Sequence, residues 1–431
     1  MLLASCLLSL VMTAQSVLEM IERDYNFAAG SYGIYPENDL PQQTPAPRGY
    51  EPFYISHYGR HGSRYLSDIK GYMIPYNTLH HADSLGKLTA LGKMALREIQ
   101  RNIADAQGRW GDLTEIGMEQ QRHIANRMLH NFPQVFSNGA FVDAHSTIVT
   151  RCALSMGTAV LQLVKEHPDL HVTMNNSYSD MWYMNHQNRA LRDSATTTRL
   201  ARKTFNSMVN RRWIQYRLMG LLFNDTAYVN KYVDTQWTFY YLMKAALMQN
   251  NTQRSLEPNE LLPLFPSEDI YLYWQVENAW NYLRSGFCPL NGGKLPYLQH
   301  YLLQQIIHEA DSIIASDLHG ASLRFGHETV LLPLVCLMGI NGYDLRTDKL
   351  EELEQNGWWS NLVHPMAGNL QIVFYRKNAS DHNPLLKVLL NEKEATLPLP
   401  SDLAPYYRWS DFRDYYLRRV GEAESALGVK R

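Results

Sequence analysis

The sequence is poor in the features that mark several protein classes. It has no CxxC redox motif and no zinc-type spacing, because its cysteines are only four and far apart: Cys6, Cys152, Cys288 and Cys336. Lysine and arginine number 40 against 42 acidic residues, so the positive excess of a general nucleic-acid binder is missing. Beyond its first residues, the chain has no unbroken apolar run of the ~20 residues that a membrane-spanning helix needs. A disulfide scaffold, a nucleic-acid-binding protein and a membrane-spanning protein are therefore disfavoured.

One apolar run stands at the start of the chain. Residues 2–12 have the length of a signal-peptide core, although no basic residue precedes them. We expect residues 1–20 to be a possible signal segment and the protein to be exported, to the periplasm, the extracellular space or vesicles. The alternative is that these residues form an ordinary helix.

Short runs rich in β-branched and aromatic residues alternate with longer helical patterns. The composition is that of a globular protein, with 45% hydrophobic and 19% charged residues. Helices are predicted over 113–132, 147–167 and 328–340, and an amphipathic one over 406–419. Strands are predicted over 52–59, 139–147, 170–175, 322–327, 370–376 and 386–391. This alternation predicts an α/β core with a central sheet flanked by helices.

The middle of the chain differs from both ends. From about residue 178 to 305 no convincing strand pattern occurs, and the segment is rich in Arg, Tyr, Trp and Met. The predicted architecture is an α/β core of residues 21–175 and 301–431, interrupted by an all-helical insertion over 176–300.

The first motif that carries chemistry is "YISHYGRHGSRY", which follows a predicted strand. Arg60 and Arg64 flank His61, and guanidinium groups bind phosphate through paired hydrogen bonds. Two neighbouring cations lower the pKa of a histidine, and a neutral imidazole can act as a nucleophile. Ligands of α/β folds bind beyond the carboxyl ends of strands, where this motif is expected. The alternative is a basic surface loop.

Two further stretches place polar residues where a predicted strand meets a helix. In "AHSTIVTRCALSM", Arg151 lies about one turn into a largely apolar helix. It is either a third phosphate ligand at a helix N-terminus or the partner of a core carboxylate. In "LRFGHETVLLPL", His327 and Glu328 end a strand and begin an apolar helix. Such a pair is usually structural when alone, but with the first motif it becomes a candidate acid/base pair.

Together these motifs resemble the histidine acid phosphatases, most closely the branch that acts on multiple inositol polyphosphates. The resemblance rests on "RHGSR" (60–64), "STIVTRCALS" (146–155), "FGHETVLLPL" (325–334) and "HPMAGNLQIVFYRK…LLKVLLNEKEATLPLP" (364–400), in the family's order. It implies a phosphoglycerate-mutase-like core with a central mixed sheet, and a helical domain that covers the active site. It also implies that neither a metal nor another cofactor is needed.

The resemblance assigns roles to individual residues. His61 would attack phosphorus and form a phosphohistidine, while Arg60, Arg64 and Arg151 neutralise the phosphoryl oxygens. His327 would hydrogen-bond the same phosphoryl group. The proton donor is harder to align, because one branch of the family has His-Asp and the other His-Ala-Glu where this chain has "HET". Alignment of "LLPL" puts Glu328 at the Asp position, so Glu328 is the predicted acid.

The predicted insertion has a strong charge bias. Residues 189–254 contain 11 Lys or Arg against three Asp and no Glu, which is +8 in a chain of −2 overall. At 100° per residue, one helical face would carry Arg199, Arg202, Lys203, Asn206, Asn210 and Arg217. Arg189 precedes this face and is a weaker candidate. A surface of one sign attracts a substrate of the other sign, although a solvated face is the usual alternative.

These observations predict a phosphomonoesterase that removes phosphates from inositol polyphosphates. The first alternative is a broad histidine acid phosphatase that acts on small phosphomonoesters. A remote alternative is a non-catalytic polyanion-binding protein, which would need the arginines but neither His61 nor His327. The oligomeric state is open.

Overall fold

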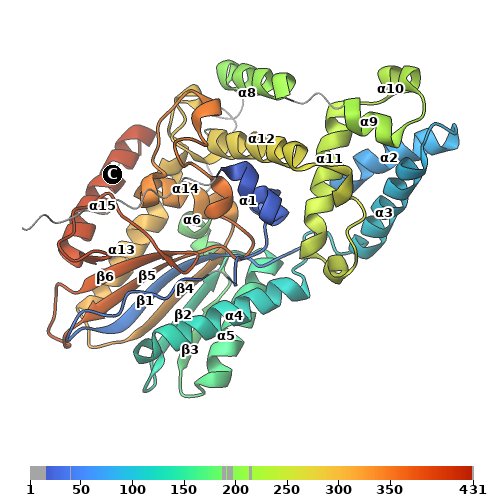
Figure 1. Cartoon of the computed structure of the whole chain (residues 1–431). Coiled ribbons are helices and arrows are strands. Elements are labelled where there is room, and N and C mark those ends of the chain that lie inside the picture. Colours follow the sequence, from blue (N-terminus) through green and yellow to red (C-terminus); the bar gives the residue numbers. More distant parts are fainter. Residues whose placement is uncertain (1–15, 39, 187–190, 192–197, 213–215, 430–431) are drawn as a thin grey trace, which may run out of the picture.

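The computed structural model describes residues 16–38, 40–186, 191, 198–212 and 216–429 (Figure 1). At its centre is one mixed sheet with the strand order β3-β2-β4-β1-β5-β6-β7, and β8 pairs with β6. The strands are β1 (Glu51–Arg60), β2 (Phe141–Ser146), β3 (His171–Asn175), β4 (Gly320–Gly326), β5 (Asn369–Arg376), β6 (Leu385–Leu390), β7 (Lys393–Glu394) and β8 (Tyr406–Arg408). The six predicted strands are therefore confirmed.

The four strands β3, β2, β4 and β1 are parallel, whereas β5, β6, β7 and β8 pair antiparallel. In β1, every residue after Glu51 is buried, as expected for a central strand with both faces covered. Helices thus have to cover both faces of the sheet.

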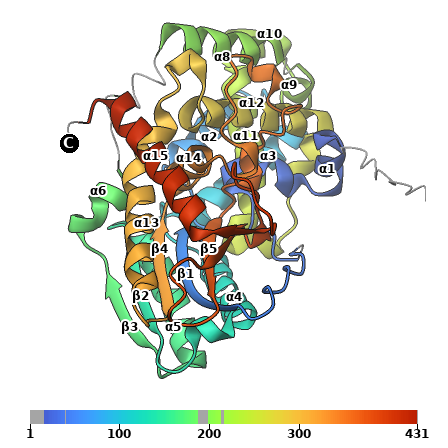
Figure 2. The ribbon, with the colours of Figure 1, turned by 90° about the vertical axis from the view of Figure 1, so that its left-hand side faces the viewer.

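Each face of the sheet has its own hydrophobic core. Helices α4 (Glu115–Asn131) and α5 (Thr150–Glu166) cover one face, where Ile55 of β1 is buried. Helices α13 (His300–Ile314), α14 (Glu328–Met338) and α15 (Trp409–Leu427) cover the other, where Tyr54 and Tyr58 are buried. Figure 2 shows α13 and α15 side by side, and Arg413 of α15 pairs with Asp311 of α13 at 2.9 Å. The predicted α/β core, with a central mixed sheet flanked by helices, is confirmed.

Between β3 and α13, every regular element of the described residues is helical. The α-helices are α6 (Met181–Met184), α8 (Arg199–Arg212), α9 (Tyr216–Leu222), α10 (Thr226–Tyr232), α11 (Thr235–Met248) and α12 (Ser267–Ser285). Two earlier helices, α2 (Lys70–Ser84) and α3 (Ala90–Ala106), pack against α11 and α9 and join this helical layer (Figure 1). The exact domain boundaries stay a prediction.

The N-terminal part of the described chain reaches the same layer. Helix α1 (Val17–Arg23) and the 3-10 segment η1 (Tyr25–Tyr32) pack against α12, and η1 also contacts α11. Among the described residues, no helix has the length and apolar character needed to cross a membrane.

Two sequence predictions about helices were wrong in detail. The predicted helix over 406–419 begins only at Trp409, because the three residues before it extend the sheet as β8. The predicted continuous basic face is divided, because α8 ends at Arg212 and Arg217 belongs to α9. Arg217 turns instead to the loop before α12 and to Asp269, whose carboxylate lies 2.9 Å from its Nη2.

Candidate active site

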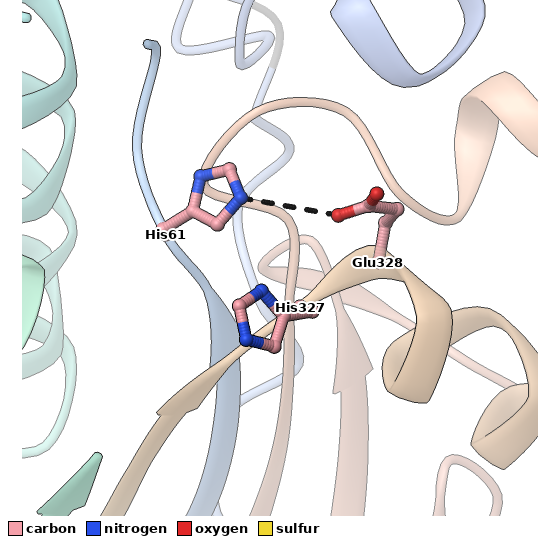
Figure 3. Close-up of side chains that lie close together, drawn as sticks. All are labelled: His61, His327 and Glu328. Atoms are coloured by element: carbon pink, nitrogen blue, oxygen red, sulfur yellow. Dashed lines mark ion pairs between the residues drawn. The ribbon is translucent and has the colours of Figure 1, made fainter. Parts of the chain in front are cut away.

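The sheet topology brings two distant histidines together. Strands β1 and β4 are parallel neighbours, with Arg60 opposite Gly326 at their carboxyl ends. His61 and His327 follow these ends directly, and their ring centroids lie 5.8 Å apart (Figure 3). The His61 backbone N–H donates to the Gly326 carbonyl at 3.0 Å, which ties the two strand ends to each other.

The hydrogen bonding of His61 fixes the tautomer of its ring. Nδ1 lies 2.9 Å from the Gly62 carbonyl oxygen, which can only accept, so Nδ1 carries the proton. Nε2 then has a free lone pair, and it is buried without a hydrogen-bond partner. Burial, followed by the charges of Arg60 and Arg64, holds the pKa of His61 well below its usual value. The imidazole is therefore neutral and able to act as a nucleophile.

The charges of three arginines, Arg60, Arg64 and Arg151, act on the His61 ring. Arg60 is held by the carbonyls of Ser31 and His364, which accept from Nη1 at 2.5 and 2.8 Å. Burial lowers the pKa of Arg60 to about 10, so it still carries its charge at neutral pH. Buried nitrogens without a hydrogen-bond partner remain on all three side chains: Arg60 Nη2, Arg64 Nε and Arg151 Nε.

Arg151 lies in the first turn of α5 and contributes to the same electrostatic environment. Its charge, like those of Arg60 and Arg64, lowers the pKa of His61. The ion pairs found among the described residues do not include one with Arg151. This arrangement disfavours the alternative in which Arg151 pairs with a core carboxylate.

His327 and Glu328 complete the group of side chains beside His61. His327 precedes the first turn of α14, and its Nε2 lies 3.1 Å from the Thr147 hydroxyl. Burial lowers the pKa of His327 to about 4, so this ring is neutral as well. Glu328 begins α14, and its Oε2 lies 3.3 Å from Arg60 Nε and 3.9 Å from His61 Nε2 (Figure 3).

Glu328 is ionised in this arrangement. Burial favours the protonated form, but the charge of Arg60, with further help from Arg64, outweighs burial and holds the Glu328 pKa well below its usual value. A bound phosphate would neutralise these arginines and so raise the pKa again. The carboxyl group can therefore carry a proton when an anion occupies the site.

The loop that carries His61 is held by a close backbone contact. A Cβ atom on Gly62 would lie 2.2 Å from the Gly117 carbonyl oxygen, and one on Gly117 would lie 2.2 Å from the Ser63 carbonyl oxygen. Only glycine at both positions allows the first turn of α4 to approach the motif this closely.

A pocket that is open to solvent extends from Glu328 along the helical layer. Its wall includes residues that the sequence analysis did not single out: Tyr32, Lys244, Glu277, Arg284 and His364. Lys244 Nζ lies 4.7 Å from the centroid of the Tyr32 ring, and Arg64 faces the same ring at 5.7 Å. The interaction with Tyr32 raises the pKa of Lys244 despite its burial, so the ammonium group is charged.

The basic residues predicted in the insertion lie elsewhere. Arg199, Arg202 and Lys203 are exposed on α8 and are not part of this pocket wall. Arg189 lies outside the described residues. Lys244 was missed because it stands within "TFYYLMKAALM", an apolar pattern typical of helix packing.

The site suits an anion better than a metal ion. Ligand atoms of His61, His327 and Glu328 lie within 4.8 Å of one another, as in a metal site. The charges of Arg60, Arg64 and Arg151 act on the same space, however, and they would oppose a cation there.

Comparisons with known proteins identify the fold. The multiple inositol polyphosphate phosphatase of Bifidobacterium longum, in a structure with inositol hexasulfate, is similar with a TM-score of 0.76 at 16% identity, over 90% of this chain and 97% of that chain. Its apo form gives 0.77 at 16% identity, over 91% and 97%. The phytase of D. castellii gives 0.66 at 14% identity, over 94% and 88%. No family model and no curated protein matched the sequence. The fold that the motifs implied is confirmed.

Proposed function

We propose that this chain is a phosphomonoesterase that hydrolyses inositol polyphosphates through a phosphohistidine intermediate. The observation that carries the proposal is the His61 ring: its Nδ1 faces the Gly62 carbonyl, and its free Nε2 lies 3.9 Å from the Glu328 carboxylate. A nucleophile, a proton donor and three arginines thus share one space. This set of groups matches what phosphoryl transfer requires, which is mainly positioning and charge stabilisation.

In the first step, His61 Nε2 attacks phosphorus and the bond from phosphorus to the ester oxygen breaks. Protonated Glu328 gives its proton to the departing oxygen, which leaves as an alcohol. Arg60, Arg64 and Arg151 stabilise the charge on the transferring phosphoryl oxygens. The neutral ring of His327 holds one of these oxygens by a hydrogen bond.

In the second step, the Glu328 carboxylate takes a proton from a water molecule as this water attacks phosphorus. The bond between Nε2 and phosphorus breaks, inorganic phosphate is released, and His61 and Glu328 return to their starting forms. The same carboxyl group therefore serves as acid and then as base.

Two observations support a polyanionic substrate. The pocket beside Glu328 carries half-buried Lys244 and Arg284 on its wall, so cations extend beyond the three arginines. The structural neighbours include an inositol polyphosphate phosphatase and a phytase. Within the same proposal, the apolar run at residues 2–12 directs the protein out of the cytoplasm.

The test is a side-by-side assay of the purified protein, without added metal, on inositol hexakisphosphate and on 4-nitrophenyl phosphate. An ordered ladder of lower inositol phosphates supports the proposal. Release of nitrophenol without turnover of the hexakisphosphate would favour a broad histidine acid phosphatase. Binding of the hexakisphosphate with no release of phosphate from either ester would favour a non-catalytic polyanion-binding protein.

A further inference from the structure

His364 is a buried histidine on the pocket wall that the proposed mechanism does not use. It lies between the short helical turn η11 (Ser360–Leu362) and β5, and only 1% of its surface is exposed. Neither Nδ1 nor Nε2 has a hydrogen-bond partner. Leaving two buried polar atoms unpaired is costly, so such a ring calls for an explanation.

The backbone holds His364 rigidly beside the catalytic groups. Its carbonyl oxygen accepts from Arg60 Nη1 at 2.8 Å, and its N–H donates to the Ser360 carbonyl at 3.3 Å. Three residues later, the Ala367 N–H donates to the His61 carbonyl at 3.0 Å. The segment that carries His364 is therefore tied directly to both residues of the Arg60-His61 pair.

The place of His364 in the fold indicates what its side chain could bind. His364 lies on the wall of the pocket that begins at Glu328, with Tyr32 and Lys244 on the same wall. Glu328 protonates the departing oxygen in the proposed mechanism, so this pocket takes the leaving group. Burial, followed by the charge of Arg60, lowers the pKa of His364 to about 4. Near neutral pH the ring is therefore uncharged and offers one N–H donor.

We propose that His364 is a specificity-determining residue that donates a hydrogen bond to a phosphate group on the inositol ring carbon next to the reacting ester. This inference rests on the proposed function, because it takes the pocket beyond Glu328 as the leaving-group site. The His364 ring gains a hydrogen-bond partner only when a substrate with such a neighbouring phosphate is bound. A simple phosphomonoester leaves it unpaired.

The test compares three variants with the wild type in binding and in turnover. His364→Leu keeps the bulk of the side chain but removes both nitrogens. His364→Asn restores an amide nitrogen near the position of Nδ1, and His364→Gln restores one near the position of Nε2. His57→Asn is the matched control, because His57 is also buried with an unpaired ring nitrogen but lies outside this pocket.

The binding probe is inositol hexasulfate, which this reaction cannot hydrolyse, measured by calorimetry. We expect His364→Leu to weaken its Kd about tenfold, as the loss of a hydrogen bond to a charged group requires. One of the two amide variants should recover most of this loss and thereby identify the nitrogen that binds. In turnover, His364→Leu should raise KM for inositol hexakisphosphate about tenfold more than KM for 4-nitrophenyl phosphate.

The outcomes separate this inference from the proposed function. Wild-type Kd in His364→Leu would overturn the role of His364, whether or not the protein is a phosphatase. An equal loss in the His57→Asn control would overturn it as well, since any buried histidine would then have the same effect. A wild-type protein that binds hexasulfate through His364 but releases no phosphate would refute the proposed function alone.

Discussion

The carboxylate of Glu328 and Nε2 of His61 face each other at 3.9 Å, although 266 positions separate them in the chain (Figure 3). This spacing leaves Glu328 close to any oxygen that departs from a phosphorus atom bound at Nε2. Glu328 is one methylene longer than aspartate, so the reach of its side chain matters for proton transfer.

The contribution of Glu328 as a proton donor depends on whether the leaving oxygen must be protonated as it departs. We expect Glu328→Gln to lower kcat on an alkyl phosphate about 10³-fold, because general acid catalysis contributes factors of this order. On 4-nitrophenyl phosphate the first step should suffer far less, because nitrophenolate leaves without a proton. Glu328→Asp is the matched variant, which keeps the carboxyl group but shortens its reach. Equal losses on both esters in a pre-steady-state assay would contradict the acid role.

The His61 assignment can be tested by loss of turnover and by capture of the intermediate. His61→Ala should reduce kcat by about 10⁴-fold or more, as removal of a catalytic nucleophile does. Binding of inositol hexasulfate should persist, because all three arginines remain. In the wild type, rapid quenching in alkali should trap phosphate on the protein, since phosphohistidine survives in base. A trapped phosphate that persists in His61→Ala would rule His61 out as the nucleophile.

The contact between Gly62 and Gly117 predicts a sharp difference between glycines. Gly62→Ala would put a methyl group 2.2 Å from a backbone oxygen, so we expect a loss of at least about 2 kcal/mol in unfolding free energy and a large loss of activity. Gly157 in α5 is the matched control, because nothing lies within 4 Å of an added Cβ there. Gly157→Ala should be neutral or stabilise by up to about 1 kcal/mol. Denaturant titration of both variants measures the difference.

The candidate active site was largely predictable because its residues stand at the ends of strands. His61 and His327 each follow a run of buried residues, and parallel neighbouring strands end at the same edge of a sheet. Local patterns therefore located both histidines before their distance was known. The order of the strands, which makes β1 and β4 neighbours, was not available from any local pattern.

The pocket beside Glu328 was not predictable in the same way. Lys244 stands in an apolar helix pattern, and Tyr32 lies on η1, which is distant in the sequence from every motif. His364 belongs to a quoted motif, but nothing in the sequence indicated that its ring would be buried without a partner. These residues meet only through tertiary packing, which the charge count over residues 189–254 could not reveal.

The ion-pair cluster at His145 predicts a pH dependence of stability. Nδ1 lies 2.8 Å from Asp180 and Nε2 lies 3.1 Å from Asp143. The hydrogen bond with Asp143, reinforced by Asp180, raises the pKa of His145 to about 9. Because the pKa of His145 is higher in the folded protein than in the unfolded chain, protonation of His145 stabilises the fold. This stabilisation is complete below pH ~6.5, the pKa in the unfolded chain, and is lost as the pH rises through about 9.

The expected size of this effect is about 2 kcal/mol of unfolding free energy between pH 6.5 and 9.5, after allowance for partial exposure. His145→Gln should be less stable than the wild type at pH 6.5 and should lose this part of the pH dependence. His382→Gln, at an exposed position in a loop, is the matched control and should follow the wild type. Parallel curves for wild type and His145→Gln would contradict the assignment.

The cations on α8 and Lys244 in the pocket are both candidates for attracting a negatively charged substrate. The effect of salt on KM distinguishes between them. Exposed charges on α8 act through solvent and are screened within about 10 Å at 0.1 M salt, whereas half-buried Lys244 is screened much less. We expect the double variant Arg202→Glu/Lys203→Glu to raise KM for inositol hexakisphosphate far more than KM for 4-nitrophenyl phosphate, and 0.5 M salt to erase most of this difference.

Lys244→Met should raise KM for inositol hexakisphosphate both at 0.1 M and at 0.5 M salt. Lys165→Glu, an exposed reversal on α5, is the control. A salt-independent effect of the α8 double variant would mean that its side chains touch the substrate directly.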